Sequence, residues 1–264
     1  MNDPFVSIIT PYYETGNLFT ETILSVEKLN YDNFEWIIID DCSVKYRASD
    51  FLSKASKECL KHVRLIQLEE NVGPNRARLR GIHQARGEFI TFLDSDDIYY
   101  PNKLSVQIKF MQEKQISMSH TDTVKFQKNQ FSNPFISANT ISWKKYLFTR
   151  KFPVNTVAVD RKYFLQKLVD SKKIETKYER SFPGEDMLIF EMLLWKTDNS
   201  YRTPQILSAY RNETSRSSNF FRNFIGIVYF QYLIICSGRR YSLLPLILVT
   251  IFAAGLSRWK TRTQ

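Results

Sequence analysis

The chain has 264 residues, of which 43% are hydrophobic and 24% are charged, and its formal net charge is +10. This length is enough for one large domain or two small ones, and the composition is typical of a globular protein, not a disordered one. Three widely spaced cysteines, none in a Cys-x-x-Cys pair, argue against a disulfide framework or a zinc site and fit a reducing cytosol.

Short apolar runs in the first part of the chain predict β-strands. These runs, rich in Ile, Val and Phe, are 5–10, 35–40, 63–68 and 88–93. Strands of this kind are typical of a parallel sheet that is buried on both faces. Apolar residues at helical spacing predict one helix over 18–29, with Asn17 as its N-cap, and another over 75–85, with Gly87 marking its end. The βαβα order therefore predicts an α/β fold with an open, mostly parallel sheet and helices on both faces.

Polar residues follow the end of each predicted strand. These strand ends are 10–14, 40–43, 69–71 and 94–97. Because the carboxyl ends of parallel strands meet at one edge of a sheet, we expect these residues to form a binding site there. The acids Asp94, Asp96 and Asp97 are the most informative, since like charges raise each other's pKa and resist burial. A divalent cation that holds a phosphorylated substrate would compensate such a cluster.

Residues 101–205 lose the regular alternation of strands and helices. Pro101 begins a predicted helix that extends to Met111, and polar loops follow it. Further on, a Pro-Gly turn leads to Glu185 and Asp186 at the start of an apolar helix. Acids in a first turn are favoured by the helix dipole, so this pair is either an ordinary cap or part of a site.

The end of the chain combines apolar stretches with basic residues. Two uncharged stretches, 223–238 and 241–257, are each flanked by Arg or Lys, and 203–264 contains eight basic residues and one acid, a net charge of +7. Each stretch is shorter than the roughly 20 residues of a spanning helix, and positive charge at both ends argues against a simple span. We expect amphipathic helices on an anionic membrane surface, with a helical hairpin packed on the rest of the protein as the alternative.

Taken together, these segments resemble the family 2 glycosyltransferases of the GT-A fold. The matching stretches are SIITPYYE, FEWIIIDDCS, ENVGPNRARLRGIHQARGEFITFLDSDD, PGEDMLIFEMLL and, at 210–218, YRNETSRSS. The resemblance covers about 1–218 and implies a GT-A-like catalytic domain. Its nucleotide-sugar-binding half would be 1–100 and its acceptor-binding half 101–218. The predicted membrane-associating tail, 219–264, lies outside it.

The resemblance implies a nucleotide site in the first half. Pro11 and Tyr13 would face the nucleotide, with Tyr13 able to stack on the base. Asp41 would contact the base or the ribose, and Arg78 would lie near the diphosphate, which a guanidinium suits geometrically. Glu14 belongs to the same group of nucleotide-sugar contacts, although the family commonly has Asn at this position.

The acidic cluster corresponds to the family's Asp-x-Asp motif. The resemblance implies that Asp94 approaches the ribose and that Asp96 binds Mg²⁺ or Mn²⁺ bridging the diphosphate. Ser95, between them, is included among the nucleotide-sugar contacts. Asp97 either tunes the site or caps the following segment.

Asp186 matches the family's catalytic base. In an inverting transfer, one carboxylate removes the proton of the attacking hydroxyl as the anomeric carbon is struck. Glu185 is the alternative base, because spacing alone does not separate the two.

The sequence therefore predicts a metal-dependent, inverting glycosyltransferase. The expected donor is a nucleotide sugar, UDP-linked, and the expected acceptor is a hydroxyl of a lipid-linked oligosaccharide in surface polysaccharide biosynthesis (O-antigen, capsule or exopolysaccharide). Asn2–Pro4 lead directly into the first strand without a signal-peptide pattern, so we expect a peripheral protein on the cytoplasmic face of a bacterial membrane.

Two other functions remain open at this stage. A sugar-phosphate nucleotidyltransferase would carry a Gly-rich loop with Lys or Arg after the first strand, where this chain has PYYETG. A non-catalytic module with a nucleic-acid-binding tail would interleave aromatic residues with basic ones, whereas the aromatic residues of this tail lie in apolar runs. We therefore expect no nucleic-acid partner. The donor sugar, the acceptor linkage and the oligomeric state stay open.

Overall fold

The computed structural model describes residues 3–127, 130–143, 145–146, 153–170, 186–194 and 199–211. The first part of the chain alternates strands with helices: β1 (Val6–Tyr12), α1 (Leu18–Glu27), β2 (Phe34–Asp40), α2 (Ala48–Leu52), α3 (Lys57–His62), β3 (Val63–Gln67), α4 (Pro74–Gln84), β4 (Phe89–Phe92), β5 (Ile98–Tyr99) and α5 (Lys103–Lys114). The second part contains β6 (Met118–Gln127), β7 (Gln130–Phe131), β8 (Thr140–Ser142), the 3-10 helix η1 (Val154–Thr156), β9 (Val157–Asp160), α7 (Arg161–Asp170), α8 (Asp186–Leu193) and β10 (Asn199–Arg211).

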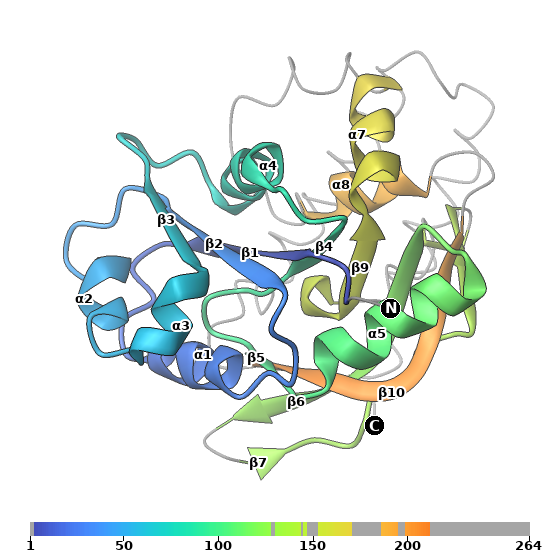
Figure 1. The fold of residues 1–264 in the computed structure, drawn as a ribbon, viewed down its shortest axis with the longest axis horizontal. Coiled ribbons are helices and arrows are strands. Elements are labelled where there is room, and N and C mark those ends of the chain that lie inside the picture. The colour runs from blue at the N-terminus through green and yellow to red at the C-terminus, as the bar shows by residue number, and fades with distance from the viewer. Residues whose placement is uncertain are drawn as a thin grey trace, which may run out of the picture.

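The described strands form one open sheet, shown in Figure 1, in the order β3-β2-β1-β4-β9-β6-β10-β5, with β7 beside β6 and β8 beside β10. Pairing is parallel from β3 through β4, and again between β6 and β10. It is antiparallel where β9 joins β4 to β6 and where β5 joins β10. The prediction of an α/β fold with an open sheet is confirmed. The larger parallel part, β3 through β4, consists of the four strands that the sequence indicates, whereas the parallel pair β6 and β10 was not predicted.

Apolar residues of alternate positions in β1 and β2 enter separate cores on the two faces of the sheet. Ile9 and Ile37 pack with residues of α4, α7 and α8, whereas Ile8 and Trp36 pack with residues of α1, α2, α3 and α5. Figure 1 shows these two groups of helices on opposite sides of the sheet. Helices on both faces are therefore confirmed, and the period of two in the strands explains why each strand supplies both cores.

Some predicted boundaries change. Asn17 occupies the N-cap of α1, but its side chain makes no capping hydrogen bond. The second predicted helix ends at Gln84, with Ala85 as its C-cap, so Gly87 lies in the turn to β4 and not at the helix end. The third helix runs over Lys103–Lys114, because Pro101 and Asn102 form the preceding turn.

The predicted tail helices at 219–264 lie outside the described residues. Among the residues that the structure describes, no helix is both long and apolar enough to cross a membrane.

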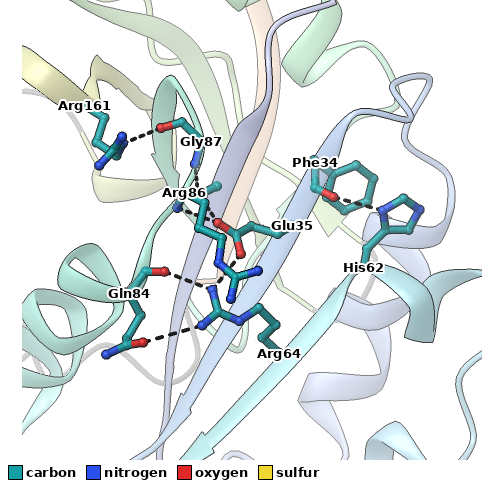
Figure 2. A network of polar contacts seen from close by, with 9 residues as sticks. Phe34, Glu35, His62, Arg64, Gln84, Arg86, Gly87 and Arg161 are labelled. Atoms are coloured by element: carbon teal, nitrogen blue, oxygen red, sulfur yellow. Dashed lines mark hydrogen bonds and ion pairs between the residues drawn. The ribbon is translucent and has the colours of Figure 1, made fainter.

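A buried carboxylate joins the strands at the edge where β1, β2 and β3 begin (Figure 2). Glu35 of β2 accepts hydrogen bonds from the Ser7 hydroxyl at 2.7 Å, the Arg86 N–H at 2.7 Å and the Arg64 guanidinium at 2.8 Å. Burial alone would raise the pKa of Glu35, but these three donors outweigh it and lower that pKa. Gly87 belongs to the same network, since its N–H donates to Ser7 Oγ at 2.9 Å.

Replacing Glu35 with alanine is expected to lower the free energy of unfolding by about 3 kcal/mol, because it removes the carboxylate partner of Arg64 and leaves the Arg86 N–H without its acceptor. Urea denaturation of the full chain measures this. Glu58→Ala is the matched control: its ion pair with Lys61 is largely exposed and should contribute little to the free energy of unfolding. Equal destabilisation by the two variants would contradict the assignment.

Candidate active site

The carboxyl ends of β3, β2, β1 and β4 lie at one edge of the sheet, because these strands are parallel neighbours. The structure therefore brings the predicted residues of the first half to the same edge. A direct contact joins two of the loops there: Thr15 Oγ1 lies 2.6 Å from Ser95 Oγ.

β1 carries Pro11 at this edge even though it is a central strand. Proline lacks the N–H that a sheet ladder uses, so it is normally confined to positions without a partner. On the β4 side, the ladder ends with Ile9 opposite Phe92, and Ile9 O accepts the N–H of Leu93. The backbone nitrogen of Pro11, two residues after Ile9, faces the same side. Because β4 ends at Phe92, no ladder hydrogen bond is needed there. Tyr13 follows with 46% of its surface exposed, so it is available to a ligand.

Glu14 holds the loop after β2. Its carboxylate accepts the N–H groups of Val44 at 2.6 Å, Lys45 at 3.0 Å and Tyr46 at 2.8 Å. These bonds, led by the one from Lys45, lower the pKa of Glu14. Its backbone has a φ of +49°, a left-handed conformation that is costly for this residue type. The contacts present are thus with the loop, and the direct role of Glu14 toward a nucleotide stays a prediction.

Glu14→Ala is expected to raise the KM for the donor about tenfold with little change in kcat. Without Glu14 the loop 44–46 loses its acceptor, and part of the binding free energy of the donor is then spent on ordering this loop. Steady-state kinetics with varied donor measure both constants. Glu70→Ala, at an exposed position near the same edge, serves as the control. A fall in kcat without a change in KM would contradict the proposed role of the loop.

Asp41 holds the loop that leads into α4. Its two carboxylate oxygens accept the N–H groups of Val72 and Gly73, each at 2.8 Å, and the residue is 2% exposed. Gly73 has a φ of +86°, which a residue with a side chain rarely adopts, and Pro74 then begins the helix. A carboxylate accepts about four hydrogen bonds, so Asp41 retains capacity for a ligand hydroxyl or N–H.

Arg78 of α4 and Asp94 form an ion pair at this edge. Arg78 Nη2 lies 2.5 Å from Asp94 Oδ1, with the arginine side chain 6% exposed and the aspartate 31% exposed. The helix approaches β1 closely at Gly81, where an added Cβ would lie 2.6 Å from Ile9 Cγ2. This close packing brings Arg78 to the end of β4, and it places a guanidinium beside the partly exposed acid.

Asp97 turns away from this edge into the protein. Its carboxylate accepts the Arg211 N–H and the Asn155 side-chain amide, both at 2.9 Å. Burial, followed by the nearby charges of Asp96 and Asp94, raises the pKa of Asp97 well above its ordinary value. Of the two predicted roles, the contacts thus favour a structural one for Asp97.

Thr22, Asn155 and Arg211 support the acidic loop, and sequence reasoning did not identify them as functional residues. Arg211 falls within the quoted Tyr-Arg segment, which was the only available signal. Thr22 and Asn155 lie far from the loop in sequence and belong to no motif, so no pattern could have indicated them.

The residues at this edge fit a metal that is held mainly by substrate. Within the described ranges, no group of three or more His, Cys, Asp or Glu residues is arranged to hold a metal ion. Mg²⁺ in nucleotide enzymes is typically bound by one or two carboxylates together with phosphate oxygens, so a complete cage of protein ligands is not required. Asp96, partly exposed on a loop with two further acids, provides such a carboxylate.

Asp186 is the first residue of α8, and Glu185 lies outside the described residues. One turn after Asp186, the Phe190 ring meets Phe92 edge-on, with centroids 6.0 Å apart. Phe92 lies two residues before Asp94, so the helix that begins at Asp186 is anchored on the strand that leads into the acidic loop.

Comparison with known proteins finds relatives that are named as glycosyltransferases. The chain is 30% identical over 210 residues to TuaG of Bacillus subtilis, named as a teichuronic acid biosynthesis glycosyltransferase, and the match covers 79% of each protein. It is 32% identical over 164 residues to Escherichia coli WfgD, a UDP-Glc:alpha-D-GlcNAc-diphosphoundecaprenol beta-1,3-glucosyltransferase, covering 61% of this chain and 62% of WfgD. An uncharacterized glycosyltransferase of Rickettsia conorii is 41% identical over 122 residues, which span 46% of this chain but 19% of that much longer protein.

Solved structures share the fold. Staphylococcus aureus TarS 1–349 in complex with UDP-GlcNAc superposes with a TM-score of 0.66 at 19% identity, covering 87% of this chain and 66% of that one. The mannosyltransferase PcManGT of Pyrobaculum calidifontis, in complex with GDP-Man and Mn²⁺, gives 0.60 at 14% identity, covering 96% and 74%. These likenesses confirm the predicted GT-A-like fold.

The family model described as "Glycosyl transferase family 2" matches residues 7–170, which include β1 through α7 and hence the whole acidic loop. This match covers more than half of the chain, and it agrees with the relative that spans most of it. The chain therefore belongs to glycosyl transferase family 2.

Proposed function

We propose that the protein transfers a sugar from a UDP-sugar to a hydroxyl of a lipid-linked saccharide, with inversion at the anomeric carbon and with a divalent cation. The observation that carries the proposal is the Arg78–Asp94 pair at the carboxyl edge of the parallel strands, beside Asp96. A nucleoside diphosphate is both the donor's recognition element and the leaving group. This edge offers a guanidinium to the diphosphate and carboxylates to the cation.

The nucleoside would bind over the ends of β1 and β2. Tyr13 is half exposed there and supplies a ring for stacking on the base, while Asp41 supplies a carboxylate that is already held in place by two backbone N–H groups. UDP-GlcNAc in the structural neighbour TarS, and UDP-Glc in the name of WfgD, support a uridine nucleotide.

The diphosphate would lie between Arg78 and the acidic loop. The Arg78 fork suits phosphate oxygens, and Asp94 keeps it pointed toward the edge in the absence of substrate. Asp96, with Asp94 beside it, would hold the cation, Mg²⁺ or Mn²⁺. When bound, such an ion stabilises the charge that the departing diphosphate gains. Mn²⁺ in the structure of PcManGT supports this choice of cofactor.

Asp186 would act as the base. Its carboxylate would take the proton of the acceptor hydroxyl as that oxygen attacks the anomeric carbon, so that the sugar bond to the diphosphate breaks while the new glycosidic bond forms. The first turn of α8 is a suitable place, since Phe190 ties this helix to β4.

Relatives support a role in bacterial polysaccharide biosynthesis. WfgD acts on a diphosphoundecaprenol-linked acceptor, and TuaG is named for teichuronic acid biosynthesis. A lipid-linked acceptor is present only at a membrane, which agrees with the net charge of +7 in residues 203–264. The proposed location is the cytoplasmic face of the membrane, with 219–264 as a membrane-associating tail that follows the catalytic domain.

A donor screen tests the class of substrate. Purified protein is titrated with UDP-Glc, UDP-GlcNAc, UDP-Gal and GDP-Man, each with Mn²⁺, with Mg²⁺ or with EDTA, by isothermal calorimetry. Saturable binding of one UDP-sugar that EDTA abolishes is the expected result. Tighter binding of GDP-Man would contradict the uridine assignment, and binding that is indifferent to EDTA would contradict the role of the cation.

Cosedimentation with vesicles tests the tail. The full chain should bind vesicles that contain anionic lipid and be released by salt, and the charge-reversal variant Arg239→Glu/Arg240→Glu should bind at least tenfold more weakly, at about 1 kcal/mol per charge near the surface. A chain shortened to 1–218 should remain in the supernatant. Vesicle binding that survives both changes would contradict the proposed role of 219–264.

A further inference from the structure

Side chains of two elements that are distant in sequence, α1 and β10, contact the backbone of the acidic loop, residues 94–97. The Thr22 hydroxyl of α1 lies 3.0 Å from Ser95 O and 2.8 Å from Asp97 O. The carbonyl between them, Asp96 O, accepts a hydrogen bond from Arg211 Nε of β10 at 3.0 Å. Three successive carbonyls are therefore turned toward the interior, an arrangement that a short loop would not keep without these donors.

Arg211 makes this contact from a fixed position. Its Nη2 lies 2.7 Å from Glu21 Oε2 of α1, its guanidinium lies 4.3 Å from the centre of the Phe126 ring, and its side chain is 4% exposed. Its own N–H donates to Asp97 Oδ1 at 2.9 Å. Arg211 is thus bound to the acidic loop through both its backbone and its side chain, and it is held laterally by α1 and β6.

The position of Arg211 matters for charge as well as for geometry. The loop carries three carboxylates within four positions, and one of them, Asp97, is buried and accepts the N–H of Arg211. The guanidinium of Arg211 offsets part of that negative charge. Because it is buried, it is not expected to contact the substrate. With Asp97 directed inward to Asn155, the remaining acids of the loop are Asp94, which meets Arg78, and the partly exposed Asp96.

We infer that Arg211 is a positioning residue for sugar transfer: it fixes the backbone of residues 94–97 so that Asp94 and Asp96 meet the diphosphate and its cation. It acts through Asp96 O and Asp97 and does not touch the substrate. This inference rests on the proposed function for the identity of the ligand, and on the contacts above for the role of Arg211.

Arg202 provides a matched control on the same strand. Its guanidinium forms a paired contact with the buried Asp122, at 2.8 and 2.6 Å. It lies nine positions before Arg211, about 30 Å away along an extended strand, and contacts no residue of the acidic loop among the described residues. Loss of either arginine breaks an ion pair of β10 in which one partner is buried, but only loss of Arg211 should disturb the loop.

The experiment compares Arg211→Lys, Arg211→Met and Arg202→Met in the full chain. The first readout is the dissociation constant for UDP in the presence of Mn²⁺, measured by calorimetry. The second is hydrogen exchange at the Asp97 amide, which in the wild-type protein donates to Asp94 O at 3.1 Å. Thermal unfolding of each variant shows that it is folded, and Arg211→Lys keeps the charge if Arg211→Met does not fold.

Both Arg211 variants are expected to weaken the binding of UDP with Mn²⁺ by about 10- to 100-fold, because a displaced loop misplaces both carboxylates. Exchange at Asp97 should accelerate in the same variants. Arg202→Met should leave both readouts near the wild-type values while lowering the unfolding temperature. Wild-type binding in a folded Arg211 variant, or an equal loss in Arg202→Met, would overturn the inference.

The two readouts also separate this inference from the proposed function. If the wild-type protein binds no UDP with Mn²⁺, the proposed donor is wrong, and exchange at Asp97 alone then decides the role of Arg211 in holding the loop. Acceleration in the Arg211 variants but not in Arg202→Met supports that role. Unchanged exchange overturns it.

Discussion

Asp96→Ala is expected to lower kcat for sugar transfer by about 10³-fold, since the loss of a cation that contributes several kcal/mol to the leaving group corresponds to this factor. Asp96 lies on a loop whose backbone is held by Thr22 and Arg211, so removing its carboxylate should leave the fold intact. Initial rates with saturating donor, over a range of Mn²⁺ and Mg²⁺ concentrations, measure the effect.

Asp96→Asn is the companion to this variant, because it keeps the size of the side chain and removes the charge. It should lose nearly as much activity and should shift the metal concentration for half-maximal rate upward. Asp32→Asn, at an exposed position before β2, is the control for a general change in charge. Full activity of Asp96→Ala at ordinary metal concentrations would remove Asp96 from the proposed site.

Asp186→Asn is expected to reduce kcat by about 10²- to 10⁴-fold, the usual contribution of one positioned base, with the KM for the donor nearly unchanged. The amide cannot accept the proton of the acceptor hydroxyl. The dependence of kcat on pH should also lose its acidic limb, because that limb reports the ionisation of the base. Rate measurements with acceptor and donor both saturating, across a range of pH, test the two expectations together.

Glu185→Gln decides which of the two neighbouring acids is the base. It removes one charge next to the start of α8, as Asp186→Asn does, so a simple effect on the helix dipole would be similar in both variants. A large loss confined to Asp186→Asn supports the proposed base, and a large loss confined to Glu185→Gln would assign the role to the other residue.

Membership of glycosyl transferase family 2 decides among the functions that the sequence leaves open. The nucleotidyltransferase and the non-catalytic module were alternatives based on a similar sheet and on the basic tail. The family match covers most of the sheet, including the acidic loop, and therefore favours the proposed glycosyltransferase over both alternatives.

The sequence predicted the first half of the fold well, because its strands bury both faces and are apolar nearly throughout. β1, β2 and β4 are buried at every position, so their composition alone marks them. The helices between them show apolar residues on one side. The βαβα order then leaves little choice of topology, since such crossovers are right-handed.

The second half could not be predicted in the same way, because its longest strands carry buried polar residues. β6 reads MSHTDTVKFQ and is buried through its first seven positions. Its polar side chains find partners on β10: His120 Nδ1 lies 2.7 Å from Ser200 Oγ, and Asp122 pairs with Arg202. Without knowledge of β10, this pattern resembles a solvated loop, and the sequence analysis described the region as irregular.

For the site, the sequence by itself determined which residue types gather at the end of each strand: an aromatic after β1, two acids at the end of β2 and three acids after β4. Local chemistry is sufficient for this inference, because three neighbouring carboxylates repel one another and resist burial unless a cation or a bound ligand compensates them. Only the tertiary structure decided which of these acids hold other parts of the backbone and which remain available to a ligand. Glu14 and Asp41 accept backbone N–H groups of other loops and Asp97 accepts one from β10, whereas Asp94 pairs with Arg78. Their hydrogen-bond partners lie from 16 to 114 residues away, and such distances in sequence are closed only by folding.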